Sequence, residues 1–153
     1  MSNERRSVTI LIADDDPDDC LLIREAFEEG PLSGDLQFSQ DGEDLLARLR
    51  NRGGYEDRGR YPRPGLVLLD LNMPKKDGRE VLAEIKGDPE LRALPVVVLT
   101  TSREEEDIIR SYRLGANSFI TKPGTFSELA EAVEALGTYW LKVVELPLER
   151  GRN

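Results

Sequence analysis

Apolar residues follow two alternating patterns along this chain. Short continuous apolar runs, such as the one before Asp70, have the length and β-branched content of strands that are covered on both faces. Between them lie longer stretches in which apolar residues recur every three or four positions, as in helices with one buried face. The short runs predict five strands, at residues 7–13, 35–40, 66–70, 94–102 and 116–124.

The periodic stretches predict five helices that alternate with the strands. They cover residues 16–30, 41–50, 77–87, 103–115 and 125–147. Asp16 and Pro17 form a favourable cap and first residue for the first helix. The alternation predicts an α/β fold, a doubly wound five-stranded parallel sheet of the (βα)5 flavodoxin-like type, with helices on both faces.

We expect a single domain over residues 1–153, with its core at about 7–140. Residues 51–64 are rich in Gly, Arg and Pro, which predicts an irregular loop that is long for this fold class. We interpret the loop as a solvated, mobile connector, with contact to a partner kinase as the alternative. Residues 138–153 form a C-terminal extension.

Polar side chains stand at the ends of four predicted strands. Asp14 and Asp15 follow the first strand and Asp70 the third, while Thr100 and Lys122 mark the ends of the fourth and fifth. Sites in doubly wound sheets form at the carboxyl ends of strands, so these side chains converge if the strands are neighbours. Clustered carboxylates repel one another, so we expect Lys122 and a divalent cation to neutralise their negative charge. Oxygen ligands without His or Cys favour Mg²⁺.

Such a pocket suits phosphoryl chemistry. A carboxylate beside Mg²⁺ and an ammonium group can attack a phosphoryl group, because both cations neutralise the oxygens of the group in transfer. Asp70 is the candidate nucleophile, and the hydroxyl of Thr100 is within plausible reach of the new phosphoryl oxygens. Taken singly, Asp15, Asp16 and Asp70 are each more often helix or turn caps, but their combination with Thr100 and Lys122 favours a site.

The amino-acid composition excludes or disfavours several classes of function. The net charge of −9 disfavours nucleic acid and anionic membranes as partners. The chain has no His, which excludes imidazole-ligated zinc, a Ser–His–Asp triad and a phosphohistidine of its own. Cys20, the one cysteine, is interpreted as a packed thiol. Because no run resembles a signal peptide or a membrane span, we expect a cytoplasmic protein.

In order and spacing, these motifs resemble a receiver domain, the response-regulator module of two-component signalling. The resemblance covers about residues 7–140 and includes "DLNMP" at 70–74, which matches the family signature D-x-N-M-P. It implies that Asp70 is the phosphoacceptor, with Thr100 and Lys122 binding the phosphoryl oxygens. A receiver is a signalling phosphoacceptor and not an enzyme acting on other substrates.

The resemblance also implies a metal site and a switch. Mg²⁺ would be bound directly by Asp15, Asp70 and the backbone carbonyl of Asn72, and through water by Asp14. Phe119 stands where the family has an aromatic residue that turns inward as the hydroxyl of Thr100 moves. Pro123 stands where the family usually has a cis peptide.

A narrower resemblance points to the stand-alone regulators that partner bacterial phytochromes. It is carried by "YPRPGLVLLD", "SYRLGANSFITKP" and "LKVVELP", by the long loop and by the C-terminal extension. It implies a sensor histidine kinase of the phytochrome type as partner and an output through protein contact. Family analogy suggests a homodimer through the fourth helix, fifth strand and fifth helix, with internal packing of the last helix as the alternative. The candidate contacts are Ile108, Ile109, Tyr112, Tyr139, Trp140, Leu141, Val143 and Val144.

Three other functions stay open. A flavin-binding protein of the same fold would need a phosphate loop after the first strand, where "DDDPDD" would repel phosphate. A Mg²⁺-dependent phosphatase of the haloacid dehalogenase type would carry its aspartyl phosphate there, in a D-x-D-x-T pattern that lacks its Thr in this chain. A receiver-like adaptor that takes no phosphate is the third.

Overall fold

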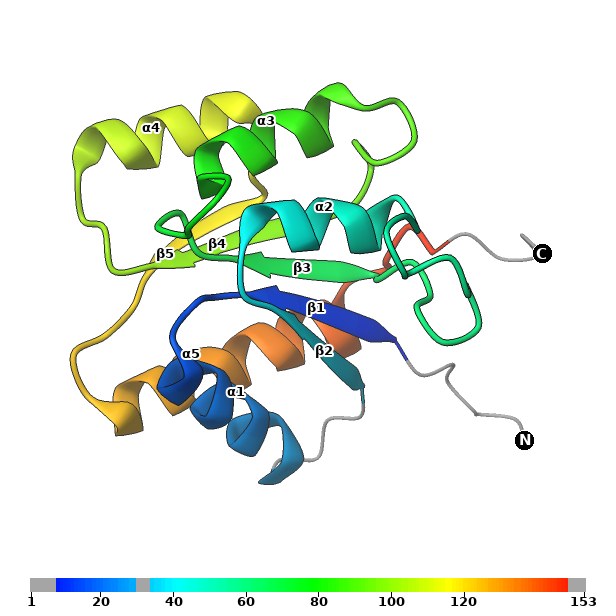
Figure 1. The fold of residues 1–153 in the computed structure, drawn as a ribbon. Coiled ribbons are helices and arrows are strands. Elements are labelled where there is room, and N and C mark those ends of the chain that lie inside the picture. The colour runs from blue at the N-terminus through cyan, green and yellow to red at the C-terminus, as the bar shows by residue number, and fades with distance from the viewer. Residues whose placement is uncertain (1–7, 30–33, 149–153) are drawn as a thin grey trace.

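A parallel β-sheet forms the centre of the structure, a computed structural model that describes residues 8–29 and 34–148. Its strands are β1 (Thr9–Ala13), β2 (Asp35–Ser39), β3 (Leu66–Leu69), β4 (Val96–Thr100) and β5 (Ser118–Thr121). Their order is β2-β1-β3-β4-β5, and all neighbouring pairs are parallel (Figure 1). This confirms the predicted fold class. A single domain over residues 1–153 reaches past the described residues and stays a prediction.

Helices cover both faces of the sheet. Two of them, α1 (Pro17–Glu29) and α5 (Phe126–Thr138), lie on one face (Figure 1). The other face carries α2 (Gly42–Leu49), α3 (Gly78–Gly87) and α4 (Glu105–Leu114) (Figure 1). None of the helices within the described ranges is long and apolar enough to cross a membrane.

Local sequence explains where several helices begin and end. Asp41 caps α2, and its side chain accepts a hydrogen bond from Asp44 N at 2.7 Å. Asp77 forms a capping box with Glu80 at the start of α3. At the end of α4, Gly115 has a φ of 110°, in the left-handed region that glycine adopts without strain.

The last helix is shorter than predicted. The apolar periodicity continues to Pro147, but α5 ends at Thr138 and a π-helical turn, η1 (Tyr139–Val143), follows. In this turn Trp140 and Leu141 pack against the cluster on the α1–α5 side of the sheet. The wider turn keeps these side chains on the sheet, so a periodic pattern alone does not reveal where the α-helix stops.

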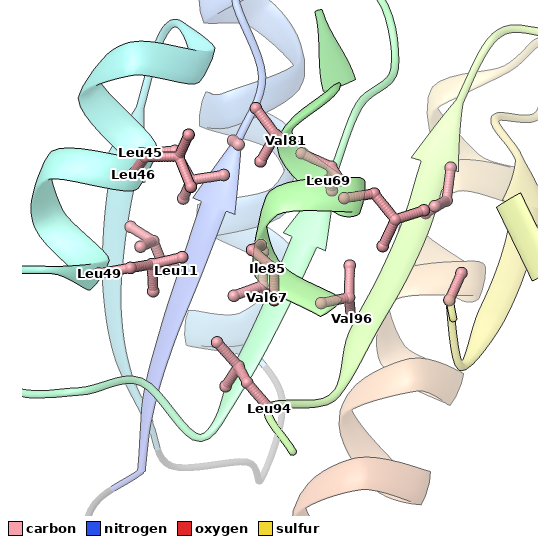
Figure 2. Packing of buried hydrophobic residues seen from close by; sticks show 14 of the residues in the cluster. Leu11, Leu45, Leu46, Leu49, Val67, Leu69, Val81, Ile85, Leu94 and Val96 are labelled. Carbon is pink, nitrogen blue, oxygen red and sulfur yellow. The ribbon is translucent and has the colours of Figure 1, made fainter. Parts of the chain in front are cut away.

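Strand side chains alternate between two apolar clusters. Every residue of β1, β3 and β4 is buried, as predicted for strands covered on both faces. On the α2–α3 face, Leu11, Val67 and Val96 meet Leu49 and Ile85 (Figure 2). Each fully buried aliphatic side chain contributes about 1.5–3 kcal/mol. The two clusters therefore hold the central strands, and with them the strand ends, in fixed positions.

The loop at residues 51–64 is irregular, as predicted, and residues 52–54 and 56–60 are exposed to solvent, but other residues of the loop make specific contacts. The side-chain amide of Asn51 donates to the carbonyls of Tyr55 and Tyr61, each at 2.9 Å. The guanidinium of Arg48 on α2 lies 4.6 Å from the centroid of the Tyr55 ring. The Gly, Arg and Pro content predicted irregular backbone correctly, but it does not show these contacts of the loop with itself and with α2.

Candidate functional site

The candidate site lies where four strands end at the same edge of the sheet. Asp14, Asp70 and Lys122 directly follow β1, β3 and β5, and Thr100 is the last residue of β4. Backbone hydrogen bonds extend the pairing past the strand ends, from Asp70 N to Ala13 O at 2.9 Å and from Lys122 N to Thr100 O at 2.7 Å. Because these four strands are consecutive neighbours in the sheet, the predicted residues come together.

The ammonium group of Lys122 lies among three carboxylates. Its Nζ is 2.7 Å from Asp14 Oδ2, 2.8 Å from Asp19 Oδ2 and 3.1 Å from Asp70 Oδ2. Lys122, Asp14 and Asp70 are each at most 7% exposed, so water screens these charges little. An ammonium group has three N–H donors, and the three carboxylates use all of them.

The carboxylate of Asp70 is held on both oxygens. Oδ1 accepts hydrogen bonds from the Thr100 hydroxyl at 2.8 Å and from Asn72 N at 3.1 Å, while Oδ2 faces Lys122. The start of α3 passes directly against this turn, since Gly78 N donates to Leu71 O at 2.9 Å. A Cβ atom at Gly78 would lie 2.6 Å from Leu71 Cα and would also strike Asp70 O. Only glycine therefore lets α3 pack this closely behind Asp70.

Three carboxylates at this edge could hold a metal ion. Asp14, Asp15 and Asp70 each offer an oxygen, and the three oxygens lie within 4.8 Å of one another. Asp15 is exposed, whereas Asp14 and Asp70 are buried. Three negative charges against the single ammonium of Lys122 leave an excess that a hard cation with oxygen ligands would offset, so the donor set fits Mg²⁺.

Burial and the ion pairs shift two pKa values. Burial raises the pKa of Asp14 from 3.8 to about 6, although its hydrogen bonds from Lys122 and from Asp16 N oppose the rise. Burial by itself would lower the pKa of Lys122, but the hydrogen bonds to Asp14 and Asp19 outweigh it and raise the pKa above its usual value. Lys122 is therefore a permanent cation at neutral pH.

The proposed switch residues lie on the two strands next to α4. Phe119 pairs with Val98 in the β4–β5 register and is half-buried against the α2–α3 cluster. Its backbone N–H donates to the hydroxyl of Tyr112 on α4 at 3.1 Å. The peptide bond before Pro123 is trans, contrary to the expectation from the resemblance. Lys122 contacts Asp14, Asp19 and Asp70 with this trans bond in place.

Asp19 is a site residue that the sequence analysis overlooked. It is the third residue of α1, and its Oδ2 lies 2.8 Å from Lys122 Nζ. Asp16, by contrast, is a helix cap, as the sequence favoured: its Oδ1 accepts a hydrogen bond from Asp18 N at 2.9 Å. In the sequence, Asp18 and Asp19 of "DDDPDD" were the only indication of a further site acid, but acids are also common in the first turn of a helix.

A charged network beyond the pocket was also missed. Arg79 on α3 forms a bidentate pair with Asp107 on α4, with Nε–Oδ1 at 2.8 Å and Nη2–Oδ2 at 2.6 Å. The hydroxyl of Ser102 donates to Asp107 Oδ2 at 2.7 Å, and Ser102 N lies 3.4 Å from Thr100 Oγ1. Arg79 and Asp107 are 28 positions apart, so no local spacing pairs them. The network connects α3, α4 and the loop after Thr100.

The thiol of Cys20 is packed, as predicted. Its Sγ lies 3.5 Å from Asp14 O, and the residue is half-buried. Burial and the neighbouring acids raise the pKa of the thiol to about 11. The thiol is therefore protonated at neutral pH and is a poor nucleophile.

Comparison with known proteins identifies the family. Residues 10–134 match the family described as "Response regulator receiver domain". The chain belongs to this family. Its members are signalling phosphoacceptors and not classical enzymes, which weighs against the alternative of a dehalogenase-type phosphatase.

Relatives support the narrower resemblance as well. Response regulator Rcp1 of Synechocystis sp. is 45% identical over 138 residues, which are 90% of this chain and 92% of Rcp1. The Mn²⁺-bound crystal structure of Rcp1 has a TM-score of 0.87, covering 92% of this chain and 99% of that one. The phosphorylated cyanobacterial phytochrome response regulator RcpA is 43% identical with a TM-score of 0.89, covering 94% and 100%. FilR2 of Methanothrix harundinacea, a probable methanogenesis regulatory protein, is 42% identical, covering 86% and 83%.

Proposed function

We propose that this response regulator accepts a phosphoryl group on Asp70 from a phosphohistidine of a sensor histidine kinase. The observation that carries the proposal is the position of the Asp70 carboxylate, with Lys122 Nζ 3.1 Å from Oδ2 and Thr100 Oγ1 2.8 Å from Oδ1. In the transfer, a carboxylate oxygen forms the new O–P bond while the P–N bond to the kinase imidazole breaks. The electron pair of that bond returns to the imidazole nitrogen. Lys122 and Thr100 then donate to the phosphoryl oxygens.

The acid cluster supports Mg²⁺ as the cofactor. We assign direct contacts to Asp15, Asp70 and the backbone carbonyl of Asn72, and a contact through water to Asp14. Rcp1 has been crystallised in a Mn²⁺-bound form, and Mn²⁺ shares the preference of Mg²⁺ for carboxylate, carbonyl and water ligands. When bound, the ion neutralises oxygens of the group being transferred.

The output is proposed to be a protein contact. Phosphorylation of Asp70 draws the Thr100 hydroxyl towards the phosphoryl group, and Phe119 follows into the space it leaves. The surface formed by α4, β5 and α5 then shifts its population between two arrangements. Ile109, Tyr112 and Tyr139, each about half exposed, offer apolar area for a second copy of the chain. A monomeric mass in light scattering, with and without phosphorylation, would contradict the homodimer.

The partner kinase is proposed to be of the phytochrome type. RcpA is described as a phytochrome response regulator, and its structure covers 94% of this chain. FilR2 is almost as similar as Rcp1 and is described as a methanogenesis regulator. Overall identity therefore does not determine the input signal. A purified phytochrome kinase that fails to transfer its phosphoryl group to this chain, while transferring it to Rcp1, would contradict the assignment.

Phosphorylation of the wild-type chain tests the proposed chemistry. Incubated with Mg²⁺ and acetyl phosphate, the chain should gain one labile phosphoryl group in intact-mass spectrometry, and EDTA should prevent the gain. The reason is that the acid cluster needs the cation before an anionic donor can approach Asp70. A chain that binds Mg²⁺ yet never gains the phosphoryl group would instead be the non-phosphorylated adaptor.

Metal affinity should fall as the pH drops through about 6. Asp14 has its pKa raised to about 6 by burial, so it is charged above that pH and protonated below it. A proton on Asp14 removes one negative charge from the cluster and competes with the cation. We expect the Mg²⁺ dissociation constant, measured by calorimetry, to rise several-fold between about pH 7 and pH 5. The Asp14→Asn variant should lose most of this pH dependence; an unchanged dependence would assign the titration to another group.

A further inference from the structure

We propose that Asp19 is a positioning residue for Lys122 that holds the ammonium group where one of its N–H groups meets the phosphoryl group on Asp70. This inference rests on the proposed function of Asp70. Asp19 lies on α1, outside the acids Asp14, Asp15 and Asp70 that form the candidate metal site. Its Oδ2 is 2.8 Å from Lys122 Nζ, and its side chain is 18% exposed, so the pair is largely shielded from water.

The carboxylate of Asp19 is not used for helix capping. At the third position of a helix, a Glu can reach back to the backbone N–H of the cap residue, as Glu80 does to Asp77 in α3. In α1 the corresponding N–H, that of Asp16, donates to Asp14 Oδ1 at 2.9 Å instead. Within the described part of the chain, Lys122 is the side chain that the Asp19 carboxylate binds. The position of the Asp19 carboxylate is therefore explained by its ion pair with the ammonium group of Lys122.

The two other partners of Lys122 are both occupied by additional contacts. Asp14 also accepts from Asp16 N and belongs to the metal cluster, and Asp70 is the group to be modified. When Asp70 becomes an acyl phosphate, the N–H of Lys122 that donated to the Asp70 carboxylate must donate to a phosphoryl oxygen instead. The N–H that faces Asp70 makes the longest of the three contacts, 3.1 Å against 2.7 Å and 2.8 Å. Asp14 and Asp19 are thus the anchors that remain, and Asp19 is the one independent of the metal.

Two neighbouring substitutions separate this role from a general effect of charge. Asp19→Asn keeps the shape of the side chain but removes the charge that anchors Lys122. Asp18→Asn removes the same charge from the same helical turn, at an exposed residue. Both variants are phosphorylated with acetyl phosphate at saturating Mg²⁺, and Mg²⁺ affinity and thermal unfolding are measured on the same samples.

We expect Asp19→Asn to slow phosphorylation by about tenfold, the effect of losing one charge-assisted hydrogen bond to the reacting group. Its Mg²⁺ dissociation constant should stay within about threefold of wild type, because Asp19 is outside the metal cluster. Asp18→Asn should phosphorylate at the wild-type rate. A purely structural role would lower thermal stability and Mg²⁺ affinity together with the rate.

Equal rates for Asp19→Asn and Asp18→Asn would overturn the positioning role while leaving the proposed function intact. So would a loss of rate in Asp19→Asn that is fully explained by weaker Mg²⁺ binding. If the wild-type chain itself takes no phosphoryl group, the proposed function fails first. The two failures are therefore distinguished by the wild-type sample in the same experiment.

Discussion

Asp70→Asn should abolish phosphorylation of the chain by acetyl phosphate or by a partner kinase. An amide oxygen is a far weaker nucleophile than a carboxylate, and the substitution also removes one of the three charges of the metal cluster. Folding should survive, because the Asn oxygen can still accept from Thr100 and Asn72 N, and Lys122 keeps Asp14 and Asp19. Intact-mass spectrometry at saturating Mg²⁺ measures the loss.

The control is Asp107→Asn, which removes a carboxylate from the network beside the pocket and leaves the acid cluster unchanged. We expect it to be phosphorylated at a rate close to that of wild type. An Asp70→Asn chain that gains a phosphoryl group as fast as wild type would show that another acid, such as Asp14 or Asp15, is the acceptor. Circular dichroism and a thermal melt show whether each variant is folded.

Lys122→Met should destabilise the fold by about 3 kcal/mol at pH 8, because it leaves two buried carboxylates and Asp19 without their cation. The loss should be smaller near pH 5. Without Lys122, the folded state holds protons on these acids that the unfolded chain releases, so stability falls as the pH rises. Urea denaturation at the two pH values measures the difference.

Added Mg²⁺ should restore part of the lost stability at pH 8, since the ion binds only the folded cluster. Lys86→Met is the matched control: its ammonium group donates to the carbonyls of Arg92 and Leu94 and not to carboxylates. Its loss of stability should be nearly the same at the two pH values. A Lys122→Met chain whose loss is equal at pH 5 and pH 8, or is unaffected by Mg²⁺, would show that the carboxylates do not depend on this ammonium group.

The fold and the centre of the site could be predicted because both follow from simple periodicities. Buried strands appear in the sequence as continuous apolar runs. A parallel sheet places the residues that follow these runs at the same edge, where the carboxyl ends of the strands lie. Asp14, Asp70, Thr100 and Lys122 were found this way, each at a strand end. The same reasoning made Asp70 a candidate nucleophile, whereas the individual metal contacts and the switch at Phe119 come from family resemblance and stay predictions.

The features that sequence reasoning missed depend on contacts between distant segments or on ambiguous patterns. Asp19 pairs with Lys122 across 103 positions, and an acid in a first helical turn already has a local explanation. Arg48 lies over the Tyr55 ring, a contact that the Gly, Arg and Pro content of this largely exposed loop does not indicate. Apolar residues recur every three or four positions through Trp140, and a single π-helical turn of five residues is too short to show its different period in this pattern.

The attachment of α4 has a consequence for its behaviour in salt. Its only fully buried residue is Ser111, whereas α3 buries Val81, Leu82 and Ile85. The Arg79–Asp107 pair links α4 to α3, in addition to the contact of Leu114 with the apolar cluster, and its side chains are 20% and 15% exposed. Salt screens exposed charges strongly but a partly buried contact pair much less. Amide hydrogens of α4 should therefore exchange faster than those of α3, which is anchored by aliphatic side chains, and the difference should change little between about 0.1 M and about 1 M salt.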